Sequence, residues 1–157
     1  MLEVGDKAPD FELPGDPGPL RLSKLKGKPV VVYFYPKDDT AGCTVEAKDF
    51  SDLLKDFTVA GAVVVGISPD GIASKAKFRK KHGLTVPLAA DEQRSVVAAY
   101  GVWVEKSMYG RKYMGVERST FLVDKAGRIS RIWRKVKVQG HAAHVLDAVR
   151  ALRTGPA

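Results

Sequence analysis

The chain has 157 residues, of which 45% are hydrophobic and 28% charged, proportions typical of one globular domain. Its single cysteine excludes an intrachain disulfide, a zinc site built on paired cysteines and a two-cysteine redox motif. The 26 basic residues exceed the 18 acidic ones by 26 − 18 = 8, which favours anionic partners but indicates no fold.

The chain carries no visible targeting segment. Residues 1–20 contain five acidic residues and no apolar run of the signal-peptide type, and no stretch approaches the ~18 apolar residues that a membrane-spanning helix needs. We therefore expect a cytoplasmic protein with no membrane association, and a reducing compartment also suits a free thiol.

The first half of the chain predicts a strand, a helix and a second strand after a turn-rich connector at 14–20. The runs at 28–35 and 62–67 are rich in β-branched and aromatic residues, which indicates strands buried on both faces. Between them, apolar residues recur at helical spacing from Phe50 onward and predict a helix over 42–57. The three elements form one parallel βαβ unit.

The second half alternates helices with strands and ends in a hairpin, because Asp124–Gly127 is a turn sequence between two strand-like runs. Parallel strands followed by antiparallel ones predict an α/β fold, a thioredoxin-like sandwich with a mixed central sheet, an N-terminal β extension and flanking helices. The expected helices are 71–82, 93–100 and 140–153, and the expected strands are 86–90, 119–124 and 128–134.

Cys43 lies between the end of the first buried strand and the start of the helix that follows. The ends of strands in α/β sheets are where ligands bind. If Thr40 or a neighbour caps the helix, the thiol lies over unpaired N–H groups and the positive end of the helix dipole, which favour the thiolate. A buried, inert thiol is the alternative, since free cysteine is among the most buried residue types. Position alone leaves both open.

Three segments are similar to the peroxiredoxins, and among these to the bacterioferritin-comigratory, or Q-type, subfamily. They are GDKAPDF at 5–11, YFYPKDDTAGCTVEA at 33–47 and YGRKYMGVERSTFLVD at 109–124. The resemblance covers nearly the whole chain, so it implies a single thioredoxin-like peroxiredoxin domain over residues 1–157.

This resemblance implies an enzyme that reduces hydrogen peroxide and organic hydroperoxides with no cofactor and no metal. Cys43 would be the nucleophile that becomes a sulfenic acid, and Arg118 would stabilise its thiolate and bind peroxide. Thr40 would orient a peroxide oxygen through its hydroxyl, and Pro36 would shield the pocket from water. Glu46, one helical turn after the cysteine, would orient Arg118.

The chain departs from the subfamily in its resolving cysteine. Many members carry that thiol five residues after the first, where this chain has Lys48, and others carry it on the next helix, where residues 71–82 contain none. We therefore expect a one-cysteine cycle whose sulfenic acid is reduced by an external thiol, namely thioredoxin, glutaredoxin or glutathione, or by a second copy of the chain. The resemblance favours a monomer or a weak homodimer.

Nucleic-acid binding is the main alternative from another functional class. Basic residues gather at 75–81 and at 128–137, where Trp133 is interleaved and could in principle stack on a base. We interpret both segments as solvated faces, of a helix and of a strand with alternating polarity, and predict no nucleic-acid partner.

Other patterns are weaker. Gly110–Gly115 has the glycine spacing of a phosphate-binding loop but lacks its lysine, so we interpret the segment as a plain loop. His141, His144 and Asp147 could share one helix face as metal ligands, but nothing completes a zinc site, and we expect a solvated face. A cysteine hydrolase would need a histidine directed at Cys43.

Overall fold

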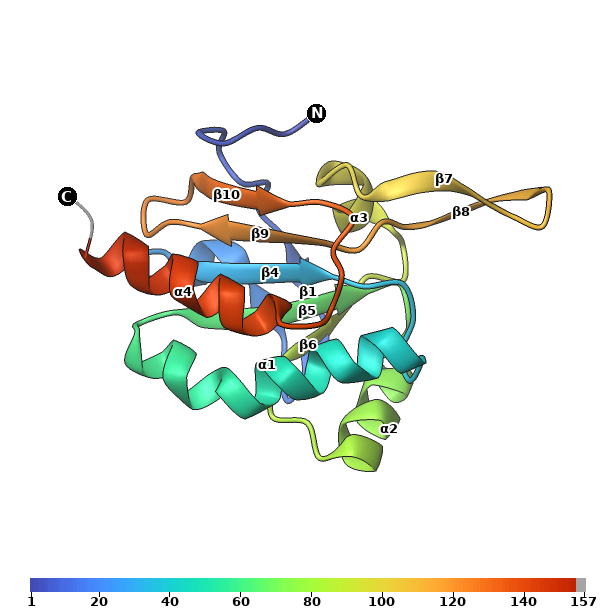
Figure 1. Ribbon diagram of the computed structural model, residues 1–157, viewed down its shortest axis with the longest axis horizontal. Helices are drawn as coiled ribbons and strands as arrows, with labels where there is room; N and C mark the ends of the chain where they lie inside the picture. Colours follow the sequence, from blue (N-terminus) through green and yellow to red (C-terminus); the bar gives the residue numbers. More distant parts are fainter. Residues whose placement is uncertain (155–157) are drawn as a thin grey trace.

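The β-branched run predicted as the first strand lies at the centre of the sheet. In the computed structural model, which describes residues 1–154, the central sheet has the order β10-β9-β4-β5-β6-β2 (Figure 1). β4, β5 and β6 are parallel, whereas β2, β9 and β10 join antiparallel to their neighbours. Smaller two-stranded sheets pair β1 with β3 and β7 with β8. The strands are β1 (Glu12–Leu13), β2 (Gly15–Asp16), β3 (Leu20–Arg21), β4 (Val30–Phe34), β5 (Val63–Ser68), β6 (Leu88–Ala90), β7 (Trp103–Met108), β8 (Arg111–Val116), β9 (Ser119–Val123) and β10 (Ile129–Trp133).

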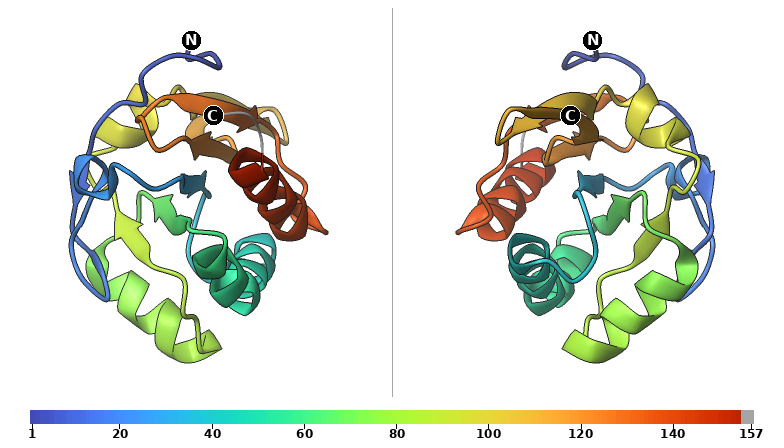
Figure 2. Two further views of the ribbon diagram at one scale, coloured as in Figure 1. Left: turned by 90° about the vertical axis from the view of Figure 1, so that its left-hand side faces the viewer. Right: turned by 90° about the vertical axis from the view of Figure 1, so that its right-hand side faces the viewer.

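Helices cover both faces of the sheet, so every residue of β4 is buried (Figure 2). α1 and α4 pack side by side on one face together with α2, and α3 packs on the other face with the N-terminal segment and the base of the β7–β8 hairpin. Two apolar clusters thus form the core, one on each side of the sheet. The helices are η1 (Leu22–Leu25, a 3-10 turn), α1 (Ala41–Val59), α2 (Ile72–His82), α3 (Ser95–Ala99) and α4 (His141–Thr154).

The predicted α/β fold with a mixed sheet, flanking helices and an N-terminal β extension is confirmed. The parallel βαβ unit forms as expected, and Phe50 and Phe57 of the predicted helical stripe are fully buried against the sheet. The ends of the elements shift by a few residues, because local pattern defines where an element lies better than where it stops.

The prediction of a loop at Gly110–Gly115 is wrong. This segment belongs to a long hairpin, β7–β8, that projects from one end of the molecule (Figure 1). Tyr109 and Gly110 both have positive φ, 53° and 78°, as the two-residue turn of a twisted hairpin requires. The turn contains no Asn-Gly or Asp-Gly pair, so the usual sequence mark of such a hairpin is missing.

Two predicted solvated faces also need correction. Lys75 is 0% exposed, and His141 is 7% exposed with its ring hydrogen-bonded to the Thr120 hydroxyl at 2.8 Å. Trp133 packs edge-on against the rings of His141 and His144, at 5.8 Å each, and so is not presented for stacking on a base. Each of these side chains contacts a residue of another element, and the polarity pattern within its own helix or strand does not reveal that contact.

Across the described part of the chain, no helix combines the length and the apolar character needed to cross a membrane.

Gly66 in β5 lies opposite Tyr33 of β4, whose buried ring stacks on Phe50 with centroids 4.5 Å apart. A Cβ at position 66 would lie 2.6 Å from the Tyr33 hydroxyl oxygen. We therefore expect Gly66→Ala to lower the free energy of unfolding by about 1–3 kcal/mol, as overpacking of a close-packed core does. Urea unfolding measures this change. Gly18→Ala is the control, because a Cβ there meets no atom within 4 Å, and equal stability of both variants would contradict the expectation.

Candidate active site

Cys43 lies in the first turn of α1, directly after the loop that leaves the carboxyl end of β4. Thr40 is the N-cap residue with extended backbone angles, and the first helical bond runs from the Thr44 N–H to the Thr40 carbonyl at 2.9 Å. The N–H of Cys43 therefore belongs to the first turn, whose N–H groups have no acceptor within the helix. The side chain of Cys43 is 1% exposed and packs in the core cluster between α1 and the sheet.

Arg118 reaches the thiol from the strand next to β4. β9 runs antiparallel to β4 with Phe34 opposite Ser119, so the start of β9 lies beside the end of β4, and Arg118 is the residue just before it. Its Nη2 donates to Cys43 Sγ at 3.3 Å, and its Nη1 donates to Glu46 Oε1 at 2.7 Å. Hydrogen bonds from a charged donor are the strong ones, and this contact places a fixed positive charge beside the sulfur.

Glu46 faces the same way as Cys43, because residues three apart share a helix face. It is 1% exposed, and burial raises the pKa of its carboxyl from 4.5 to about 7, although the nearby charge of Arg118 acts to lower it. Its second oxygen, Oε2, is buried with no hydrogen-bond partner among the described residues. A proton on that oxygen would be consistent with both observations, since neutral carboxyl groups tolerate burial better than ionised ones.

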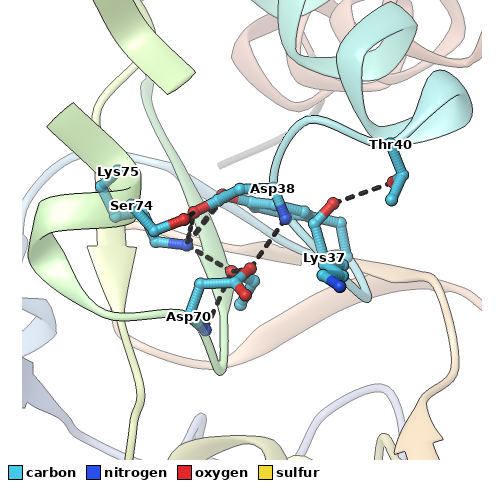
Figure 3. Close-up of polar contacts among 8 residues, drawn as sticks. Lys37, Asp38, Thr40, Asp70, Ser74 and Lys75 are labelled. Carbon is cyan, nitrogen blue, oxygen red and sulfur yellow. Dashed lines mark hydrogen bonds and ion pairs between the residues drawn. The ribbon is translucent and has the colours of Figure 1, made fainter. Parts of the chain in front are cut away.

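The remaining predicted site residues lie in the loop between β4 and α1. Thr40 does not cap the helix with its side chain; its hydroxyl instead donates to the Lys37 carbonyl at 2.9 Å, which leaves the oxygen able to accept (Figure 3). Pro36 is half-buried where the chain leaves the sheet. Lys48, at the position of the expected second cysteine, is exposed on α1.

The sequence interpretation missed a buried polar cluster beneath this loop. Lys75 of α2 hydrogen-bonds Asp38 of the loop, and four further residues join them: Tyr35, Ser68, Asp70 and Ser74 (Figure 3). Burial lowers the pKa of Lys75, while the charge of Asp38 acts to raise it. One sequence pattern could have indicated this burial, because Lys75 precedes the buried Phe78 by three residues and so shares its helix face.

The three histidines all have partners other than the thiol, which argues against the hydrolase alternative. His82 bonds Asp39 at 2.7 Å, His141 bonds Thr120, and His144 lies 3.3 Å from an Arg131 nitrogen. A hydrolase of this type needs a histidine that takes the proton from the cysteine.

Residues 4–132 of the chain match the model of the AhpC/TSA protein family. The chain belongs to this family. The peroxiredoxin Bcp of Bacillus subtilis is 49% identical over 95% of this chain and 96% of its own length. A putative peroxiredoxin of Coxiella burnetii is 51% identical over 92% of this chain and 97% of its own length.

Solved structures agree with this assignment. The structure of Xanthomonas campestris peroxiredoxin Q has a TM-score of 0.89 and 42% identity, covering 98% of both chains. That of peroxidoxin BcpB from Mycobacterium tuberculosis has a TM-score of 0.85 and 38% identity, covering 98% of this chain and 100% of its own. The chain is therefore a thiol-dependent peroxidase with a thioredoxin-like peroxiredoxin fold, as its sequence predicts.

Glu46 gives the stability of the protein a defined dependence on pH. Because the pKa of its carboxyl rises from 4.5 to about 7 on folding, the folded state binds more protons between these values, and stability falls as pH rises through this window. Glu46→Gln keeps an oxygen toward Arg118 but cannot ionise. We expect the stability of this variant relative to wild type to rise by about 1–3 kcal/mol from pH 5 to pH 8 in urea unfolding. A difference that is constant over this range would contradict the assignment.

Gly42 leaves room for the guanidinium of Arg118 beside the thiol, since a Cβ at position 42 would lie 3.2 Å from Nη2. Alanine is the better helix former, by up to about 1 kcal/mol, so Gly42→Ala should leave the thermal midpoint unchanged or higher. The guanidinium must yield by a few tenths of an ångström, and we expect the rate constant of Cys43 with hydrogen peroxide to fall about threefold or more, because the charged donor beside the sulfur is displaced. Lys48→Ala, exposed on the same helix, should leave this rate unchanged, and a wild-type rate in Gly42→Ala would refute the link.

Proposed function

We propose that this peroxiredoxin reduces hydrogen peroxide and organic hydroperoxides to water or alcohol in a one-cysteine cycle through a sulfenic acid on Cys43. The observation that carries the proposal is the 3.3 Å contact from the Arg118 guanidinium to the thiol of the chain's single cysteine. The proposal includes a single domain, a cytoplasmic location and a monomer or weak homodimer.

The chemical step transfers one oxygen atom to sulfur. The Cys43 thiolate attacks the terminal peroxide oxygen, the S–O bond forms as the O–O bond breaks, and the departing oxygen takes a proton to become water or an alcohol. Negative charge moves from sulfur to that oxygen, so a fixed cation beside both atoms stabilises the transition state. Arg118 supplies this cation without reorganisation, because Glu46 holds its other nitrogen at 2.7 Å. In this proposal Glu46 is a positioning residue.

Two further groups would bind the peroxide. The Thr40 hydroxyl has its proton directed to the Lys37 carbonyl, so its oxygen is an acceptor for the peroxide O–H. The Cys43 N–H in the first helical turn is a donor for the other oxygen. Pro36, half-buried at the end of β4, would keep water from the thiolate.

Reduction of the sulfenic acid requires two thiol equivalents from outside the chain. A first external thiol condenses with it to release water and form a mixed disulfide, and a second thiol attacks that disulfide and regenerates Cys43. Thioredoxin, glutaredoxin and glutathione are the candidate donors. The bacterioferritin comigratory protein of Xanthomonas campestris, whose structure is 41% identical in sequence to this chain, has alkyl peroxide reduction activity, which supports organic hydroperoxides as substrates.

The test combines turnover with identification of the oxidised species. Peroxide consumption should require Cys43 and one of the three thiol systems, and Cys43→Ser should abolish it. One equivalent of peroxide should yield a monomer whose sulfenic acid is trapped by dimedone, seen by intact mass spectrometry.

Equal activity in Cys43→Ser would end the proposal of a Cys43 cycle. Recovery of the protein only as a disulfide-linked dimer would refute the monomeric sulfenic acid and favour resolution by a second copy.

A further inference from the structure

A fully buried ammonium group lies beneath the loop that carries the active-site cysteine. Lys75 of α2 is 0% exposed, and its Nζ donates to both carboxylate oxygens of Asp38, at 3.0 and 3.3 Å, and to the Tyr35 hydroxyl at 3.0 Å (Figure 3). It also bonds the Ser68 hydroxyl at the end of β5. A buried charge is tolerated only when it is paired and hydrogen-bonded, and this one is paired and fully bonded.

The partner of this lysine, Asp38, is fixed from several directions. One carboxylate oxygen accepts the Tyr35 hydroxyl at 2.5 Å and the other accepts the Ser74 hydroxyl at 2.7 Å. Its backbone N–H donates to Asp70 Oδ2 at 2.7 Å. The loop is thereby joined to α2 and to the segment after β5, which are distant in sequence from it.

Asp38 lies in the loop that leads directly into α1. It lies two residues before the N-cap Thr40 and five before Cys43, and the hydroxyl of Thr40 is itself bonded to the Lys37 carbonyl. Arg118 approaches the thiol from β9, on a different part of the chain. The 3.3 Å contact between them therefore depends on the loop being held, and displacements of about 1 Å in such sites can slow reactions by a hundredfold.

We propose that Lys75 is a positioning residue of the peroxidase site, whose buried pair with Asp38 holds the Pro36–Thr40 loop and so aligns Cys43 with Arg118. This rests on the proposed function of Cys43. Lys75 touches no reacting atom. Loss of its ammonium leaves the Asp38 carboxylate buried without a cation, which drives the loop toward open conformations.

Two reagents should respond to loss of this pair in opposite directions. Peroxide reacts with the assembled site, whereas a bulky disulfide reagent such as 5,5′-dithiobis(2-nitrobenzoate) reaches a thiol that is 1% exposed only when the loop opens. In Lys75→Met we expect the rate constant of Cys43 with hydrogen peroxide to fall about tenfold or more, and its rate with the bulky reagent to rise severalfold. Lys77→Met, two residues along the same helix and exposed, is the matched control and should change neither.

Both rates are measured well below the thermal midpoint, where under about 1% of each variant is unfolded. A purely structural role would lower the midpoint but, at that temperature, could not reduce the peroxide rate tenfold.

If Lys75→Met fails to fold, Ser74→Ala is the deciding variant, since it removes one hydrogen bond to Asp38 and keeps both charges. A slower reaction with peroxide and a faster reaction with the bulky reagent, both smaller than those expected for Lys75→Met, support the proposal. Parallel changes, or no change in either rate, overturn it. A wild type that does not react with peroxide refutes the proposed function, while the bulky-reagent rates still test the hold on the loop.

Discussion

The contact of one guanidinium with two buried acidic groups organises this protein's site. Arg118 lies 3.3 Å from the Cys43 sulfur and 2.7 Å from a Glu46 oxygen, and both partners are almost fully buried. Two anions and one cation would leave a net negative charge in the core, which is unfavourable. Burial raises the pKa of Glu46 to about 7, so the carboxyl is partly protonated near neutral pH, and a proton there reduces the negative charge beside Arg118. The carboxyl can still accept a hydrogen bond and orient the guanidinium.

The sheet provides the geometry for this contact. β4 and β9 are antiparallel neighbours, so the last residues of one lie beside the first residues of the other. The chain that leaves β4 enters α1 and brings the cysteine, and the chain that enters β9 brings the arginine. In the proposed function, polar groups in the first helical turn would complete the site for the peroxide, because helix N-termini and strand ends commonly bind small polar ligands.

Burial of the thiol bears on how the proposed cycle closes. A peroxide molecule is small, but the external thiol that reduces the sulfenic acid has to contact a sulfur that is 1% exposed. Lys48, where many subfamily members have the second cysteine, is on the exposed side of α1. In the proposed cycle the loop before α1 would have two tasks, to hold the thiol against Arg118 for the first step and to release it for the second, and its attachment to α2 would affect both.

The sequence by itself determined the order of the elements, the mixed sheet, the family and the candidate site residues, because local hydrophobic pattern and a contiguous motif carry that information. Those candidates are Cys43, Thr40, Arg118, Pro36 and Glu46.

Tertiary structure alone decided which groups meet. The contact between Arg118 and Cys43 joins residues 75 positions apart, and the burial of Lys75 depends on Asp38, 37 positions away. A basic helix segment looks solvated until the loop packed against it is known. The physical reason is that burial and charge pairing depend on neighbours across space, and periodicity within one segment describes only that segment.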